Sequence, residues 1–129
     1  MIVVDSSVWI DFFADRSTAQ VDRLQNVIKA RRIVVGDIIL LELLQGARDN
    51  VHAAAIELRM KAFLLERFLN TDLAKKAAEN FRSLRSKGVT IRRTPDLVIG
   101  TYCIERGLPL LHNDRDFDHM AEHLGLQLA

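Results

Sequence analysis

Five acidic residues lie where a short apolar segment ends or within an expected helix, and they are spread over most of the chain: Asp5, Glu42, Asp96, Asp114 and Asp116. In an open parallel sheet the carboxyl ends of the strands meet at one edge, where such proteins bind their ligands. Carboxylates gathered there would repel one another unless a cation lay among them. Hard oxygen ligands suit Mg²⁺ or Mn²⁺, which orient phosphate oxygens and activate water, so the pattern indicates metal-assisted hydrolysis.

Each of these acids also has a purely structural interpretation, and spacing alone does not decide between the two. Asp96 could complement a helix dipole, and Asp114 or Asp116 could cap a helix. Glu42 belongs to a polar stripe of an expected helix, which is typical of a solvated face. Asp5 could also be a cap, but two serines follow it and make it redundant in that role, which favours a function.

The elements that would position these acids alternate between short apolar strands and helices. Strands are expected at residues 2–4, 32–35, 68–69, 108–111 and 126–128. Helices are expected at residues 6–14, 18–30, 37–49, 50–67, 72–87, 94–106 and 116–124. Thr94 is expected to cap the helix that contains Asp96, with Pro95 in its first turn. This alternation predicts a three-layer α/β fold, in which helices cover both faces of a short-stranded central parallel sheet.

Length and composition predict a single globular domain over residues 1–129, because 49% of the residues are hydrophobic and 27% are charged. No apolar run approaches the ~18–20 residues of a membrane span. The single cysteine, Cys103, excludes an internal disulfide, which fits a cytoplasmic protein. A net charge of +1 argues against holding a nucleic acid by charge alone, but leaves room for an enzyme that touches a few phosphates.

Three other functions compete with metal-assisted hydrolysis. The pattern His119-x-x-Glu122-His123 matches one class of zinc peptidase, but little chain follows it to supply a third ligand. A haloacid-dehalogenase-like or receiver-like phosphoryl-transfer protein also places an aspartate after its first strand. The dehalogenase pattern requires a second aspartate where this chain has Ser7. A non-catalytic α/β interaction module would have acids that only cap helices.

Four segments in this order closely resemble the PIN domain family, and more narrowly its VapC-type toxins: VDSSVWID (4–11), LELLQG (41–46), TPDLVIG (94–100) and LLHNDRDF (110–117). The resemblance implies a PIN-like fold and a metal-dependent endoribonuclease belonging to a toxin–antitoxin pair. It implies that Asp5 and Asp96 hold the principal Mg²⁺ or Mn²⁺ and that Asp114 and Glu42 complete the pocket. Asp116 matches a further acid near the site.

The match extends to the residues beside the acids, with one departure. Ser6 matches the small hydroxyl residue that follows the family's first acid. His112 stands before Asn113-Asp114, where the family often has Thr or Ser. This change removes a hydroxyl contact to Asp114, and it affects the support of the site more than the activity.

RNA is the substrate that the resemblance implies. Four arginines are candidate contacts to its phosphates because they flank the acids in the sequence: Arg48, Arg92, Arg93 and Arg115. Ordinary surface charge is the competing interpretation of each arginine, and the sequence does not identify the RNA that is cut.

Two protein partners are also implied by the resemblance. A cognate VapB-type antitoxin would lay a segment across the groove and send a basic side chain into the acidic pocket, by charge complementarity. A homodimer would form through the helical layer. The apolar residues that could form this interface, or alternatively the core, are Ile56, Met60, Phe63, Leu64 and Phe68.

Overall fold

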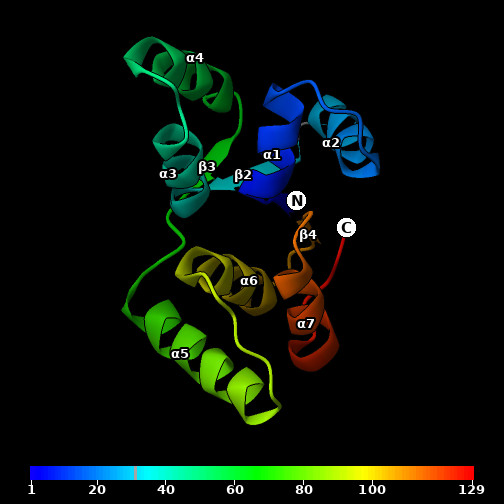
Figure 1. Cartoon of the computed structure of the whole chain (residues 1–129), viewed down its shortest axis with the longest axis vertical. Coiled ribbons are helices and arrows are strands. Elements are labelled where there is room, and N and C mark those ends of the chain that lie inside the picture. Colours follow the sequence, from blue (N-terminus) through cyan, green and yellow to red (C-terminus); the bar gives the residue numbers. More distant parts are fainter. Residues whose placement is uncertain (31) are drawn as a thin grey trace.

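The computed structural model describes residues 1–30 and 32–129, and it has the three-layer α/β organisation that the sequence predicts (Figure 1). Over these residues the elements follow in the order β1 (Ile2–Val4), α1 (Ser6–Phe13), α2 (Ala19–Lys29), β2 (Ile33–Gly36), α3 (Asp37–Gln45), α4 (Asn50–Met60), β3 (Leu64–Glu66), α5 (Thr71–Ser86), α6 (Thr94–Arg106), β4 (Leu110–Leu111) and α7 (Arg115–Leu124).

The four strands form one parallel sheet in the order β3-β2-β1-β4. Helices α1 to α4 lie in the upper half of Figure 1 and α5 to α7 in the lower half. β1 and β4 are neighbours, and Val4 on β1 pairs with Leu111 on β4. The residues that follow these two strands therefore emerge side by side at the same edge of the sheet.

The central strands are short and continuously apolar because helices cover both of their faces. Val3, Val4 and Leu110 have no exposed surface, and the remaining core residues of the strands are almost fully buried. Leu24 and Ile39 pack into the same core from α2 and α3. The sheet is thus a rigid base from which the loops at its carboxyl edge project.

Side-chain caps determine where several helices begin. Asp5, Thr18, Asn70 and Asp114 each accept a hydrogen bond from a backbone N–H in the first turn of the helix that follows. At the other end of α6, Gly107 has a φ of 64°, a left-handed conformation that suits glycine and stops the helix. Asp5 caps α1 in spite of the serines beside it, so the expectation that it is redundant as a cap is wrong.

The third strand is not where the sequence places it. β3 is Leu64–Glu66, after α4 has ended at Met60, so the expected helix to residue 67 and the expected strand at 68–69 are both wrong. Phe68 instead inserts its ring into the core, where it stacks on Tyr102 with ring centroids 3.6 Å apart. Gly36 lies against this ring and has no room for a side chain.

Two smaller expectations also need correction. Thr94 does not cap α6 as expected: it is the first helical residue, Arg93 is the N-cap residue, and no side chain hydrogen-bonds to this end of the helix. The segment expected as a final strand at 126–128 forms only an isolated bridge, between Leu110 and Leu128. In the described part of the chain, no helix is both long enough and apolar enough to cross a membrane.

The apolar residues proposed for a dimer interface belong mostly to the core of the single chain. Ile56, Met60 and Phe68 are buried, Phe63 is half-buried, and Leu64 alone of the five is exposed. α4 packs against α3, although Val51 and Leu58 of α4 are exposed. Three of these five residues therefore offer no surface to a second copy, and the homodimer stays a prediction.

Candidate active site

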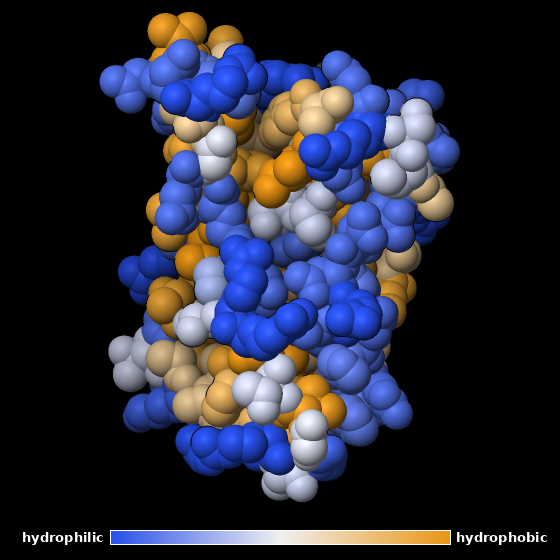
Figure 2. All heavy atoms as spheres, viewed as in Figure 1, coloured by the Kyte–Doolittle hydropathy of each residue, from blue (hydrophilic) through white to orange (hydrophobic). Residues whose placement is uncertain are grey.

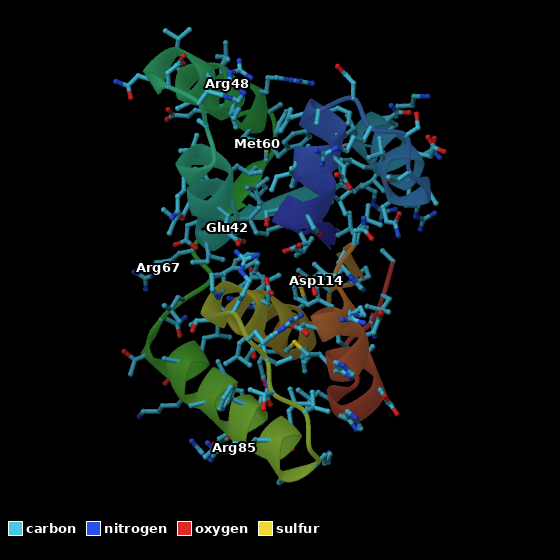
Figure 3. All side chains as sticks on the ribbon, viewed as in Figure 1. Glu42, Arg48, Met60, Arg67, Arg85 and Asp114 are labelled. Atoms are coloured by element: carbon cyan, nitrogen blue, oxygen red, sulfur yellow. The ribbon has the colours of Figure 1, made fainter. Side chains whose placement is uncertain are left out.

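The fold gathers the predicted acids at the carboxyl edge of the sheet. Asp5 directly follows β1, Asp114 lies just beyond β4, and Asp96 lies in the first turn of α6. Carboxylate oxygens of Asp96, Asp114 and Asp116 all lie within 4.8 Å of one another. Figure 3 labels Glu42 on α3, among the upper helices, and Asp114 at the start of α7, among the lower ones. Hydrophilic side chains form a band across this part of the surface (Figure 2).

Asp5 and Asp114 each cap a helix with one carboxylate oxygen, which leaves the other oxygen for the site. Oδ2 of Asp5 accepts a hydrogen bond from Ser7 N–H at 3.0 Å, and Oδ1 of Asp114 accepts one from Asp116 N–H at 3.0 Å. In each carboxylate, the hydrogen bond of one oxygen to the helix therefore fixes the orientation of the other oxygen. The structural and functional interpretations of these two acids are compatible.

Two buried carboxylate oxygens in this cluster have no hydrogen-bond partner in the described chain: Oδ1 of Asp5 and Oδ2 of Asp96. The two residues are only 3% and 2% exposed. A buried charged oxygen without a partner costs several times what an ordinary hydrogen bond contributes. A divalent cation supplies the contact that these oxygens lack, and a set of carboxylates is the donor set that Mg²⁺ and Mn²⁺ prefer, so the residues fit such an ion.

Burial and mutual repulsion raise the pKa values of three of the acids. Burial is the main cause of the raised pKa of Asp5, with a further contribution from Asp114. Burial and then the charge of Asp5 raise the pKa of Glu42, although Ser6 and Arg93 partly oppose this. The pKa of Asp96 rises from 3.8 to about 7, because the residue is buried beside Asp5 and Asp114. Burial is the largest cause of each shift, and repulsion between the carboxylates adds to it.

Glu42 differs from the aspartates because both of its oxygens are already bound. Oε1 accepts a hydrogen bond from Ser6 Oγ at 3.1 Å, and Oε2 accepts one from Nη2 of Arg93 at 2.5 Å. Its side chain is only 8% exposed, so Glu42 points into the site and not along a solvated helix face.

The four predicted arginines lie at different places relative to the acids. Arg93 pairs with Glu42, while Arg92 approaches Asp116 more loosely, with 3.8 Å between Nη2 and Oδ1. Arg115 begins α7 and lines a cavity of about 330 Å³ beside Asp114. Arg48 lies in the turn between α3 and α4, well away from the labelled Glu42 and Asp114 in Figure 3. In the described structure, two of the four arginines, Arg92 and Arg93, thus form ion pairs with acids of the site.

Sequence reasoning missed the bracing role of Asn113, and it expected His112 only to remove a contact to Asp114. Asn113 N–H donates to Ser7 Oγ at 3.0 Å, which ties the end of β4 to α1. His112 accepts a hydrogen bond on Nδ1 from Asp114 N–H at 3.1 Å, and its ring packs against Phe117. The histidine thus supports Asp114 through a ring nitrogen where the family often has a hydroxyl. Only the position of these residues next to the acids could have indicated such a role.

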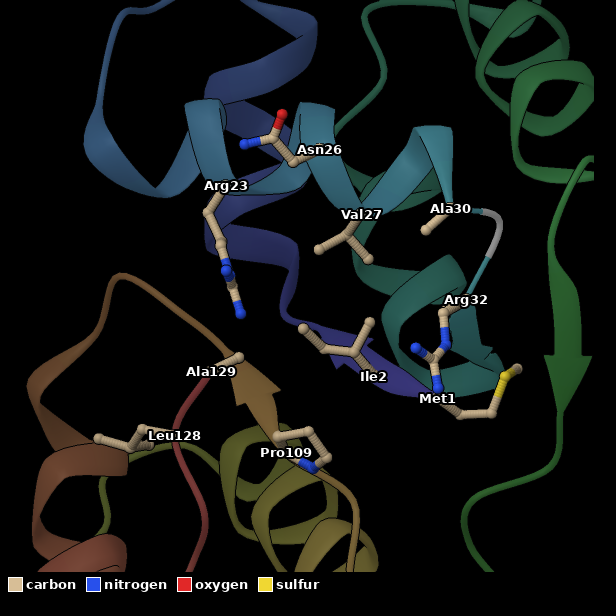
Figure 4. A pocket seen from close by; sticks show the side chains of 10 residues that line it. All are labelled: Met1, Ile2, Arg23, Asn26, Val27, Ala30, Arg32, Pro109, Leu128 and Ala129. Carbon is tan, nitrogen blue, oxygen red and sulfur yellow. The ribbon is translucent and has the colours of Figure 1, made fainter.

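A cavity of about 500 Å³ lies at the opposite edge of the sheet, where β1, β2 and β4 begin (Figure 4). Ile2 and Pro109 form part of its wall, and Arg23 and Arg32 extend toward it. None of the described residues that line it is an aspartate or a glutamate, so it lacks the groups that characterise the acidic cluster. Although this cavity is large, it has no carboxylates that could hold a cation, so the candidate active site is the acidic cluster.

Comparisons with known proteins agree with the fold and with the sequence motifs. The chain is 30% identical over 134 residues to "VapC ribonuclease Mb1587" of Mycobacterium bovis and to "Ribonuclease VapC11" of Mycobacterium tuberculosis, covering all of this chain and 98% of each relative. Among solved structures, VapBC2 from Rickettsia felis bound to a promoter DNA fragment matches with a TM-score of 0.79 at 18% identity, over 100% of this chain and 98% of the other. VapBC-1 from nontypeable Haemophilus influenzae matches with a TM-score of 0.74 at 20% identity, over 100% and 97%.

The family model described as PIN domain matches residues 2–123, which is nearly the whole chain and includes every acid of the cluster. The resemblance drawn from the four sequence segments is therefore confirmed, as is the predicted fold. This chain belongs to the PIN domain family.

Proposed function

We propose that this PIN domain protein is a VapC-type ribonuclease toxin that hydrolyses RNA phosphodiester bonds at the acidic cluster, with Mg²⁺ or Mn²⁺ as its cofactor. Full-length similarity to VapC ribonucleases supports the activity. Two observations carry the metal-dependent mechanism: the carboxylates of Asp96, Asp114 and Asp116 meet within 4.8 Å of one another, and Asp5 and Asp96 each bury an oxygen without a partner in the described chain.

A bound divalent ion would polarise the scissile phosphate and lower the pKa of an attacking water. Asp5 and Asp96 would hold the ion through their unpartnered oxygens, with Asp114 and Asp116 beside them. The capping bonds of Asp5 and Asp114 keep these carboxylates oriented before substrate arrives, which lowers the cost of assembling the site. The carboxylate cluster in the described part of the chain includes no histidine, and we assign no general base to a histidine or a lysine.

The proposal includes a VapB-type antitoxin as partner. The similar folds of VapBC2 and VapBC-1 come from toxin–antitoxin structures, and the acidic cluster would attract a basic side chain from a partner segment. A homodimer and a cytoplasmic location belong to the same proposal. For the homodimer, Leu58 on α4 and Leu64 and Leu65 on the edge strand β3 are exposed apolar residues in the segment that the sequence indicated.

The first test is cleavage of a mixed cellular RNA pool by the purified protein in Mg²⁺ or Mn²⁺. EDTA and an Asp96→Asn variant serve as controls, and circular dichroism verifies that the variant is folded. We expect discrete products with 5′-phosphate and 3′-hydroxyl ends that are absent from both controls. Products that persist in EDTA or in the variant would contradict the assigned site. A folded wild-type protein that binds Mn²⁺ and RNA weakly or not at all would favour the non-catalytic interaction module.

A further inference from the structure

We propose that RNA continues from the acidic cluster along a groove beside α2, in which Arg115, Arg23 and Arg32 bind its phosphates. This inference rests on the proposed function, because it concerns the path of the strand that the acidic cluster would cut. A strand held at the phosphate that is cut has to continue away from the site on both sides. Residues outside the cluster must therefore also contact the substrate, and a row of cationic residues begins beside the cluster.

Two adjoining cavities, together called the α2 groove, lead from the cluster to the opposite edge of the sheet. The near cavity, of about 330 Å³, begins at Asp114 and Arg115. The far cavity, of about 500 Å³, lies where β1, β2 and β4 begin (Figure 4). Leu128 and Ala129 line both cavities, so the far cavity follows directly on the near one. A strand that leaves Asp114 through the near cavity therefore enters the far one.

One face of α2 forms a wall of the α2 groove over the length of the helix. Gln20, in the first turn, lines the near cavity, whereas Arg23 and Asn26 line the far cavity. Successive members of this set are three residues apart, which makes them neighbours on the surface of a helix. Ala30, at the C-cap, extends the wall to about 15 Å. The single acid of α2, Asp22, lines a different cavity, so this wall carries no negative side chain.

Three arginines along the α2 groove have no acidic partner in the described chain. None of its ion pairs includes Arg115, Arg23 or Arg32, although Arg92 and Arg93 at the acidic cluster are paired. Each of the three lines one of the two cavities, and in Figure 4 the side chain of Arg23 extends from α2 toward β4. Their guanidinium groups are therefore available to an anionic ligand in the α2 groove.

Negative side chains of the described residues line the α2 groove only at its near end. Asp114 belongs to the acidic cluster, and Asp118 lies 3.5 Å from Nε2 of His112. The described residues of the far cavity include no aspartate or glutamate, so no carboxylate side chain there offsets the charge of Arg23 and Arg32. The far cavity therefore attracts phosphates that lie beyond the one that is cut.

The ligand class follows from these residues. Guanidinium groups bind the phosphate oxygens of a nucleic acid without regard to its sequence. The amides of Gln20 and Asn26 can bond to ribose 2′-hydroxyls, which distinguish RNA from DNA. No aromatic side chain is among the described residues that line the far cavity, so bases have nothing to stack on and binding depends on the charge of the backbone. A single-stranded RNA backbone is thus the occupant that the α2 groove fits.

RNA binding tests the α2 groove in the full chain, in an Asp96→Asn background that should prevent cleavage. Fluorescence anisotropy with a fluorescein-labelled single-stranded RNA of about 12 nucleotides would compare Arg23→Gln/Arg32→Gln with Arg82→Gln/Arg85→Gln. The control makes the same charge change on α5, far from α2 (Figure 3). We expect the groove variant to bind about tenfold more weakly and to lower the slope of log affinity against log salt by about 1.4. The control should change the affinity by less than about twofold.

Photo-crosslinking locates the RNA on the same background chain. A benzophenone attached through a thiol at Asn26→Cys lies at the far cavity, and the same label at Ser86→Cys lies on the exposed end of α5. The native Cys103 is buried and stays unlabelled. We expect irradiation to join RNA to the label at position 26 and not to the label at position 86. A label at position 26 that captures no more RNA than the label at position 86 would overturn the inference.

The outcomes separate this inference from the proposed function. Equal RNA binding by the two double variants would overturn the α2 groove even if the wild type proves to be a metal-dependent ribonuclease. In that case the acidic cluster would hold RNA without the arginines of the groove. A folded wild-type chain that neither binds nor cleaves RNA would overturn the α2 groove and the proposed function together.

Discussion

In the absence of metal, the stability of this protein should fall as the pH rises from 5 to 8, because the pKa values of Asp5, Glu42 and Asp96 are raised in the folded chain. The pKa of Asp96 is raised from 3.8 to about 7 by burial and by Asp5 and Asp114. Between these two values the folded chain retains a proton that the unfolded chain has lost. The stabilising contribution of this proton is therefore complete below about pH 4 and disappears as the pH passes about 7.

The size of the effect follows from the shift. The full difference of about three pKa units corresponds to about 4 kcal/mol, and about 2.5 kcal/mol of it is lost between pH 5 and pH 8. The assay is urea unfolding followed by circular dichroism in EDTA at both pH values. Asp96→Asn should lower the difference by about 2.5 kcal/mol, because an amide has the same shape and does not ionise. Asp15→Asn is the matched control, since Asp15 is exposed and its φ of 56° is one that asparagine tolerates.

Excess Mn²⁺ should reverse the trend in the wild type, because the ion stabilises the ionised carboxylates of the folded state and binds better at pH 8. The reasoning would be refuted if the metal-free wild type were equally stable or more stable at pH 8, or if Asp96→Asn kept the full pH dependence.

Three other predictions concern the core. Gly36→Ala should lower the free energy of unfolding in urea by about 2 kcal/mol, because the added Cβ would lie 2.5 Å from the buried Phe68 ring. Gly46→Ala is the control and should change it by less than about 1 kcal/mol, because the nearest atom to its Cβ is 3.6 Å away. Equal effects of the two substitutions would contradict this account. Asn80→Ala should cost about 2 kcal/mol, since the amide donates at 3.0 Å to a threonine hydroxyl with no exposed surface, and a loss below about 0.5 kcal/mol would mean that the bond is unimportant. Burial raises the thiol pKa of Cys103 to about 12, so the native protein should not react with Ellman's reagent at pH 8 until urea unfolds it; rapid reaction of the native protein would show that the thiol is accessible.

The sheet and the gathering of the aspartates could be predicted because local pattern and topology agree there. Ile2–Val4 is apolar throughout, as a strand covered on both faces should be, and Asp5 follows it directly. Asp114 follows a second apolar run, and parallel strands bring their carboxyl ends to one edge. For these residues the spacing in the sequence was sufficient to place the side chains near one another.

The remaining features depend on partners far away in the sequence. All three residues of β3 are exposed, so no burial pattern marks this strand, whereas Phe68 is buried by a ring on α6 that only the tertiary fold brings to it. The pair of Glu42 and Arg93 joins residues 51 positions apart, and nothing in the polar stripe of α3 indicates it. The same stripe fits a solvated face equally well, which is why the role of Glu42 could not be decided from the sequence.

The bond between Asn113 N–H and Ser7 Oγ spans 106 residues, and this has a consequence for folding. Closing so large a loop costs configurational entropy that only the completed β1–β4 pairing offsets. A growing chain would carry Asp5 and Glu42 well before Asp114 is synthesised, so the acids could not act together until the last part of the chain had been made. For the same reason, any fluctuation that separates β4 from β1 would divide the cluster at once, and an inhibitor that bridges the two strand ends would gain affinity by preventing that separation.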